Sequence, residues 1–420
     1  MIRHIFKIIW NERRTNSWIV IEFVLVFTVL WFCTDFLYDV TVRYLQDTGY
    51  DIKHTYSVKF AHQKSTPELI ERYEKENARY EDAMTIVDRI MKYPGVESVS
   101  LSETAVPYEY SYSGGSYLIN ADTVAIQLRI KKVTASFFDV FKIKPVSGQL
   151  FSNDNPTDRV IISSKNGEFL ETHPTSEVAQ VKVGWGSDRN PMTVMGIVNT
   201  PMSNYIRGPE NSIFFNLKKE EINISHNQLA LRVSSNADVD FAEKFMEDMR
   251  EQLNVGEYYL ASIESGKSIL KKVADMAGIS NNVKSTLSIT AFLLVNIFLG
   301  TIGTFWFLTQ SRRSEIGLRI ALGSSKRKVT GWIISETLII LLITSVIATV
   351  ICVNVSMTDL LESMGLPVVS RPEDAPVDYL RQIINYVITF GVLALISVAA
   401  VWYPASQAAK VQPADALRDE

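Results

Sequence analysis

The chain has 420 residues, of which 47% are hydrophobic, and a formal net charge of −4 at pH 7. This charge argues against a nucleic-acid-binding surface, and the length allows two or three domains. The apolar residues gather in four long blocks, and a helix needs roughly 20 mostly apolar residues to cross a bilayer. The sequence therefore predicts an α-helical membrane protein with four transmembrane helices, and not a soluble enzyme.

The N-terminal region suits a membrane surface followed by a span. Residues 2–10 (IRHIFKIIW) place three isoleucines and Phe6 on one helical face, so residues 1–16 are expected to form a cytoplasmic interfacial helix. The first transmembrane helix is expected over 17–38. Acidic residues stand at its end in place of a small-residue cleavage site, which indicates an uncleaved signal anchor.

Residues 39–284 are expected to form one large α+β extracytoplasmic domain. Helices are expected over 66–91, from a Thr-Pro-Glu start, and over about 238–253. Alternating and β-branched residues predict strands at 56–60, 96–101, 125–133, 159–162, 179–183, 193–198, 212–215 and 228–233. The turn-rich stretch 108–117 (YEYSYSGGSY) is interpreted as an exposed loop, with a partner-contact loop as the alternative.

Three further transmembrane helices are expected over 285–310, 330–355 and 383–403. Basic residues dominate the segments before the first span and between the second and third, whereas acidic residues dominate the short outer loop 356–382. Cytoplasmic loops carry an excess of lysine and arginine. Both termini are therefore expected in the cytoplasm, together with the segment 311–329 and the tail 404–420.

A few side chains stand out within the predicted spans. Glu22 is costly in lipid, so it either faces another helix or a partner subunit, or snorkels to the interface, which its short distance from the start of the span favours. Gly300 and Gly303 in the second span would allow close helix packing. The two cysteines, Cys33 and Cys352, both lie in spans, so the outer domain is expected to have no disulfide.

No arrangement of catalytic or metal-binding residues emerges from the sequence. His54 and His62 have a weak spacing for a shared metal, and there is no HExxH motif. Gly266-Lys267-Ser268 is similar to the end of a phosphate-binding loop, but the glycine required five positions earlier is Ala261. The tripeptide is interpreted as a loop before the helix that leads into the second span. We expect no catalytic, cofactor or metal site, and a chain that is not itself an enzyme.

The cytoplasmic segment Arg312–Lys328 reads RRSEIGLRIALGSSKRK, with apolar residues interleaved among basic ones. We expect a short amphipathic helix, a break at Gly323-Ser324-Ser325, and a helix that continues as the third span. Such an element suits docking on a cytoplasmic partner. A membrane-surface helix held by anionic lipid is equally compatible with the periodicity.

Here the chain resembles the FtsX-like/MacB family of ABC transporter permeases. The segment after the second span is similar to that family's R-x-x-E-I-G-x-R-x-A-x-G pattern, closing on Glu336, and the tail is similar to its P-A-x-x-A-x-x-x-x-P-x-x-A-L pattern. The residues of the first are Arg312, Glu315, Ile316, Gly317, Arg319, Ala321 and Gly323. Those of the second are Pro404, Ala405, Ala408, Pro413, Ala416 and Leu417. Residues 133–151 also resemble the family's S-x-x-F-F stretch, whereas Glu22 stands where many members have a small, glycine-containing pattern.

This resemblance implies a permease subunit of an ABC transporter that works by mechanotransmission in the bacterial inner membrane. A separate cytoplasmic ATPase would bind and hydrolyse ATP, and the segment from Arg312 to Gly323 would couple it to the membrane helices. A second permease protomer and membrane lipid are further expected partners, and a periplasmic adaptor is a further candidate. The outer domain would be a MacB-like periplasmic core with a porter-like part and a β-rich part, serving export or extraction of a substrate from the envelope.

Other functions stay open on the sequence alone. An FtsX-type regulator would activate extracytoplasmic wall hydrolases instead of moving a cargo. A membrane receptor would bind a ligand with its outer domain, but no cytoplasmic segment is long enough for an output domain. A membrane-anchored hydrolase would need the active site that the sequence lacks.

Overall fold

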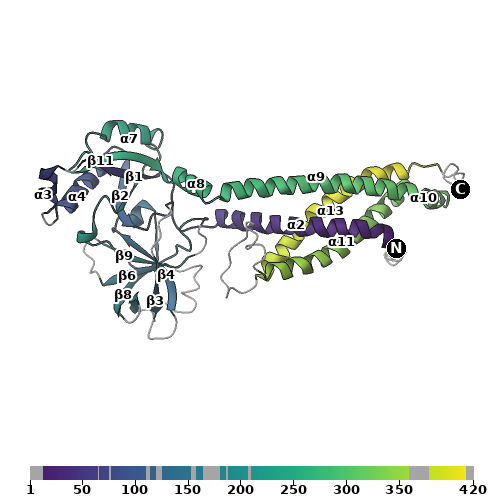
Figure 1. Ribbon diagram of the computed structural model, residues 1–420, viewed down its shortest axis with the longest axis horizontal. Coiled ribbons are helices and arrows are strands. Elements are labelled where there is room, and N and C mark those ends of the chain that lie inside the picture. The colour runs from purple at the N-terminus through teal and green to yellow at the C-terminus, as the bar shows by residue number, and fades with distance from the viewer. Residues whose placement is uncertain are drawn as a thin grey trace. The chain divides into compact units, whose positions relative to one another are not determined.

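The computed structural model describes residues 13–64, 66–74, 77–109, 114–119, 125–152, 158–163, 180–185, 188–206, 210–358 and 378–412. It divides into two compact units (Figure 1). The helical unit comprises Met1–Val42 and Ser280–Glu420, and the sheet unit comprises Arg43–Ile279. The predicted interfacial helix, most of the outer loop 356–382 and the end of the tail lie outside the described residues.

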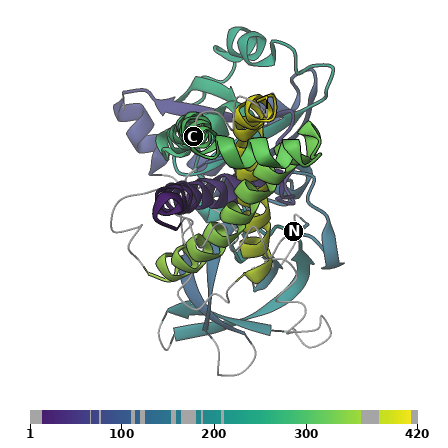
Figure 2. The same cartoon turned by 90° about the vertical axis from the view of Figure 1, so that its right-hand side faces the viewer.

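The helical unit contains four long helices, each long and apolar enough to cross a membrane. They are α2 (Arg13–Leu45), α9 (Ile279–Ser311), α11 (Lys326–Ser356) and α13 (Tyr379–Ala408). Within the described residues, the prediction of four membrane-spanning helices is confirmed. A short helix, α10 (Arg313–Ala321), stands between α9 and α11. Helices α11 and α13 cross α2 and α9 at an angle (Figures 1 and 2).

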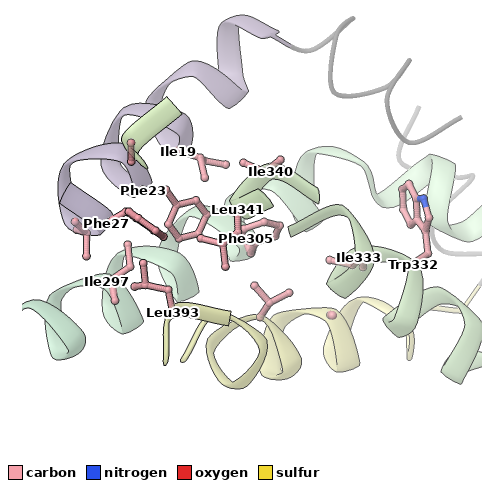
Figure 3. Close-up of a cluster of buried hydrophobic side chains, with 14 of the residues drawn as sticks. Ile19, Phe23, Phe27, Ile297, Phe305, Trp332, Ile333, Ile340, Leu341 and Leu393 are labelled. Atoms are coloured by element: carbon pink, nitrogen blue, oxygen red, sulfur yellow. The ribbon is translucent and has the colours of Figure 1, made fainter. Parts of the chain in front are cut away.

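A cluster of large apolar side chains holds the four helices together. Phe23 and Phe27 of α2 are fully buried against Phe305 of α9 and Leu341 of α11 (Figure 3). Between helices in lipid, packing and not the hydrophobic effect supplies the attraction. Close contact of these side chains therefore determines how α2, α9 and α11 pack against one another.

The sheet unit is built on eleven strands in the order β11-β1-β10-β2-β4-β3-β7-β8-β6-β9, with β5 paired to β8. The strands are β1 (Thr55–His62), β2 (Val96–Glu103), β3 (Gly114–Ile119), β4 (Ala125–Val133), β5 (Pro145–Gly148), β6 (Arg159–Ser163), β7 (Gln180–Trp185), β8 (Asp188–Val198), β9 (Ser212–Asn216), β10 (Gln228–Val233) and β11 (Tyr258–Ser265). Strand β4 pairs with β9 as well as with β3, so strands β4-β3-β7-β8-β6-β9 close into a ring. The unit thus has a closed β-rich part and a sheet with helices, which confirms the predicted α+β class.

The sheet formed by β11, β1, β10 and β2 is antiparallel throughout. Helices α4 (Ala78–Met91) and α7 (Phe241–Met249) contribute Ile86, Ile90 and Phe245 to a core shared with Leu231 and Tyr258 of the sheet. The unit's other helices are α3 (Pro67–Tyr73), α5 (Phe137–Val140), α8 (Gly266–Met276) and a 3₁₀ turn at Lys219–Glu221.

A buried ion pair ties three segments of the sheet unit together. The Lys131 ammonium donates to the Tyr50 hydroxyl at 2.9 Å, to the Ser203 hydroxyl at 2.8 Å and to the Glu210 carboxylate at 3.1 Å. Burial alone would raise the pKa of Glu210, but the neighbouring Lys131 and Ser203 hold that pKa below its ordinary value. Burial alone would lower the pKa of Lys131, but Tyr50 and Glu210 raise it. Both groups are therefore charged at neutral pH.

Several predicted elements need correction. The helix expected over 66–91 is two helices, because Asn77, at the start of α4, has a positive φ of 74° that no continuous helix accepts. The helix expected over 238–253 covers only Phe241–Met249, since Asp240 has φ 56°. Strands β3, β5 and β11 were not predicted.

Two predicted loops also differ from the structure. Gly266-Lys267-Ser268 is not a loop but the first turn of α8, because the Ser265 hydroxyl accepts from the Ser268 amide and caps the helix at 3.3 Å. The stretch 108–117 begins with Tyr108, whose side chain is fully buried, and continues into β3. Its description as an exposed loop is wrong at both places.

Candidate functional site

The sequence pattern at residues 312–323 predicted a coupling segment, and this segment contains helix α10 in the structure. The helix ends in a Schellman motif: Gly323 has φ 90°, its amide donates to Ile320 O at 2.9 Å, and the Ser324 amide donates to Arg319 O at 3.0 Å. Ser325 then caps α11. The predicted helix, glycine break and following helix are confirmed, and we call this region the α10 junction (residues 312–336).

A buried ion pair joins the end of α9 to α11. Nη1 of Arg312 lies 2.9 Å from both carboxylate oxygens of Glu336, and the two side chains are 8% and 1% exposed. Burying two charges is expensive unless they are paired and hydrogen-bonded, as they are here. The glutamate that closes the sequence pattern is therefore the partner of the arginine that opens it.

A second contact fixes α10 itself against α11. The Arg319 guanidinium lies over the Trp332 ring, 3.7 Å from its centroid, and donates to the Glu315 carboxylate at 2.7 Å. Cation–π and (i, i+4) ion-pair contacts both favour this arrangement. Ile316 and Gly317 of the same helix are buried, so one face of α10 is internal.

The opposite face of α10 is open. Leu318 is 50% exposed and Leu322 is 80% exposed, and Ala321 and Gly323 are exposed as well. The predicted coupling residues therefore divide into two groups. Arg312, Glu315, Ile316, Gly317 and Arg319 build and position the junction, whereas Ala321 and Gly323 are exposed. Leu318 and Leu322, which the sequence pattern did not single out, also face outward.

The C-terminal pattern contributes to the same packing. Pro404, Ala405 and Ala408 lie in α13 and are buried, and the two alanines belong to the apolar cluster that contains Ile316 and Ile333. Small side chains let neighbouring helices approach closely. The pattern's last residues, Pro413, Ala416 and Leu417, lie outside the described residues.

Glu22 lies at a helix contact. Its carboxylate rests against Gly300 of α9, where an added Cβ would overlap it. Of the two alternatives left by the sequence, the structure shows contact with a neighbouring helix, with the side chain half-buried. A Cβ at Gly303 would meet no atom within 4 Å, so only Gly300 makes room for this packing.

The sequence missed a polar cluster near the other end of the helical unit. Arg381, assigned to the outer loop, lies in the first turn of α13 and pairs with Asp35 and Asp39 of α2. Asn385 also donates to Asp35. The signal available in the sequence was the spacing of Arg381, Asn385 and Thr389, which are four residues apart in an otherwise apolar block and therefore share one helix face.

No metal-binding arrangement was predicted, and the histidines have other neighbours. His54 Nδ1 lies 2.8 Å from Asp238, and His62 Nδ1 lies 3.9 Å from Glu257. In the described part of the chain, no group of three or more His, Cys, Asp or Glu side chains could hold a metal ion.

Residues 287–413 match the family model of the FtsX-like permease C-terminal domain, a range that includes the whole α10 junction. The chain is similar to a macrolide export ATP-binding/permease protein MacB of Neisseria meningitidis serogroup A, at 22% identity over 352 residues (77% of this chain, 50% of the relative). It is 24% identical over 321 residues to a MacB 2 of Aeromonas hydrophila subsp. hydrophila (70% and 45%). The chain thus spans about half the length of the curated relatives it matches.

Two solved structures show a weaker likeness. The periplasmic region of MacB from Actinobacillus actinomycetemcomitans has a TM-score of 0.32 and 13% identity, covering 55% of this chain and 96% of that one. The extracellular domain of the ABC-type transporter YknZ from Gram-positive bacteria has a TM-score of 0.30 and 14% identity, covering 49% and 100%.

Proposed function

Since the chain is an FtsX/MacB-like ABC permease, we propose that it couples ATP hydrolysis by a separate ATPase subunit to movement of its sheet unit. The observation that carries this proposal is the α10 junction. A short helix with one internal face and one exposed apolar face stands between two membrane helices.

A displacement of α10 can be transmitted to the membrane helices because the α10 junction is joined to them by a buried ion pair and a cation–π contact. Arg312 joins α9 to Glu336 of α11, and Arg319 joins α10 to Trp332 of α11. A force applied to α10 therefore reaches both helices at once. Helix α9 continues along the chain from α8 of the sheet unit, which provides a covalent path to that unit.

Leu318 and Leu322 are the side chains that we assign to the ATPase contact. They lie four residues apart on one exposed helix face, which suits insertion into an apolar groove of a partner. The exposed basic residues at the start of α11, Lys326, Arg327 and Lys328, would attract anionic lipid or an acidic rim of the partner.

Basic residues concentrate at the α10 junction, which the positive-inside rule assigns to the cytoplasm. The termini would then also be cytoplasmic, and the sheet unit would lie outside a bacterial inner membrane. ATP would be bound by the partner, and two permease protomers would form the working membrane assembly. Export or extraction of an envelope substrate is the work that the sheet unit would perform.

A pull-down of the cognate ATPase tests the contact. We expect Leu318→Ala with Leu322→Ala to lose most of the ATPase, because truncation removes the apolar side chains that would be buried in the partner's groove. The matched control is Leu342→Ala with Val346→Ala, two exposed apolar residues with the same spacing on α11 away from the junction. Replacing Lys326, Arg327 and Lys328 by glutamine should weaken capture less. Retention of the ATPase by the leucine variant, or its loss only in the basic-cluster variant, would refute this assignment.

A further inference from the structure

Arg381 binds α2 at the end of the helical unit from which α2 continues into the sheet unit, here called the sheet-side end. Its Nε donates to Asp35 Oδ1 at 2.7 Å, its Nη1 donates to Asp39 Oδ1 at 3.0 Å, and its Nη2 donates to the Asp35 carbonyl oxygen at 3.2 Å. The arginine is 9% exposed. All three nitrogens of its guanidinium thus engage one helix.

Two further polar side chains extend this contact along α13. The Asn385 amide donates to Asp35 Oδ1 at 2.5 Å, and the Thr389 hydroxyl lies 3.2 Å from the Thr34 hydroxyl. Asn385 and Thr389 are each 1% exposed. Residues four apart share a helix face, so Arg381, Asn385 and Thr389 form one polar stripe on α13.

This stripe, together with Thr34, Asp35 and Asp39, resists separation. Within or beside the hydrocarbon region, parting the helices would leave charged and hydrogen-bonding groups without partners, at a high cost in free energy. Helices α2 and α13 are therefore held together more firmly here than apolar packing alone would hold them.

Helix α9 is held differently. Its tie is at the α10 junction, where Arg312 pairs with Glu336 of α11. Against α2 it packs through apolar and small side chains: Phe305 lies in one buried cluster with Phe23 and Phe27, Gly300 lies under the Glu22 carboxylate, and Thr290 lies beside Cys33. Parting α13 from α2 would leave the Arg381 guanidinium without its carboxylates, whereas displacing α9 along α2 disturbs apolar and small side chains, which costs less.

We propose that Arg381 is a positioning residue that clamps α2 to α13, so that α9 is the helix that shifts when a partner acts on the α10 junction. The clamp rests on the contacts of Arg381, Asn385 and Thr389 with α2 and is independent of the proposed function. The shift of α9 rests on the proposed function.

Distance measurements between spin labels on the full chain in lipid nanodiscs test both parts. With Cys33 and Cys352 replaced by alanine, one label pair at Val42 and Tyr379 reports α2 to α13, and a second at Val42 and Lys284 reports α2 to α9. We expect the first distance distribution to be narrow and unchanged when the ATP-loaded ATPase is added. The second should change its mean. A change in the first distance, or none in the second, overturns the assignment of α9 as the shifting helix.

The contact between α2 and α13 can be measured on the chain without the ATPase. Arg381→Gln should broaden the distribution between Val42 and Tyr379, Arg381→Lys should restore most of its sharpness, and the neighbouring Gln382→Ala should leave it unchanged. A narrow distribution in Arg381→Gln would refute the clamp. If the ATPase does not bind the chain at all, the α9 shift falls with the proposed function, while the partner-free measurement still decides the clamp.

Discussion

Removal of one charge from the pair between Arg312 and Glu336 should strongly destabilise the helical unit. In Glu336→Gln, the Arg312 guanidinium stays buried but loses its carboxylate. Breaking a buried pair in this way costs about 3–5 kcal/mol. The matched control is Glu315→Gln, which removes a carboxylate from the half-exposed pair with Arg319, worth only about 0.3–0.5 kcal/mol. Unfolding in mixed micelles, followed by tryptophan fluorescence, compares the two variants.

The double variant Arg312→Met with Glu336→Leu removes both charges, so it isolates the interaction within the pair from the cost of leaving one charge unpaired. Replacing both charges by apolar groups of similar volume is often neutral or stabilising, so this variant should unfold close to wild type. A coupling free energy from the full mutant cycle then measures the interaction. Additive effects of the two single variants, or a loss below about 1 kcal/mol for Glu336→Gln, would refute a buried, coupled pair.

Four further predictions concern other parts of the chain. Gly300→Leu should displace the Glu22 carboxylate from the α2–α9 contact and weaken it, and Glu22→Ala should relieve that effect in cross-linking between the two helices. Lys131→Met should destabilise the sheet unit, because it removes the ammonium partner of the buried Glu210 carboxylate. Arg129 still lies 3.5 Å from that carboxylate, so the loss should stay below the about 3–5 kcal/mol of a fully unpaired buried charge. Since the pKa of Glu210 is lowered, its contribution should be present above its ordinary pKa of 4.5 and lost as pH falls below it, which pH-dependent unfolding would show. A cysteine at Ser324 should resist membrane-impermeant labels added from outside, and external labelling there would overturn the orientation.

The features that the sequence predicted well depend on local pattern. Four apolar blocks of sufficient length predict four membrane helices whatever their packing. The helix, break and helix at the α10 junction follow from Gly323 and Ser325, whose conformational preferences act within a few residues. Most strands of the sheet unit were predicted because β-branched residues alternate along them.

The features that the sequence did not predict depend on distant partners. Arg381 and Asp35 are 346 positions apart, so the spacing of polar residues along α13 can suggest a polar helix face but cannot identify its partner. The closure of β4 onto β9 likewise joins segments whose pairing no periodicity encodes. At α10, the sequence pattern named Arg312 and Glu336 but predicted neither their pairing nor the outward direction of Leu318 and Leu322, because both depend on how the helices pack.

The most direct test of coupling between this chain and a separate ATPase is ATP hydrolysis measured on three samples in the same nanodiscs: the chain alone, the cognate ATPase alone, and the two together. We expect no hydrolysis by the chain, and an ATPase rate that changes on complex formation and returns to the rate of the ATPase alone in the Leu318→Ala, Leu322→Ala variant. Robust hydrolysis by the chain alone, or an ATPase rate that the chain does not alter, would contradict the account.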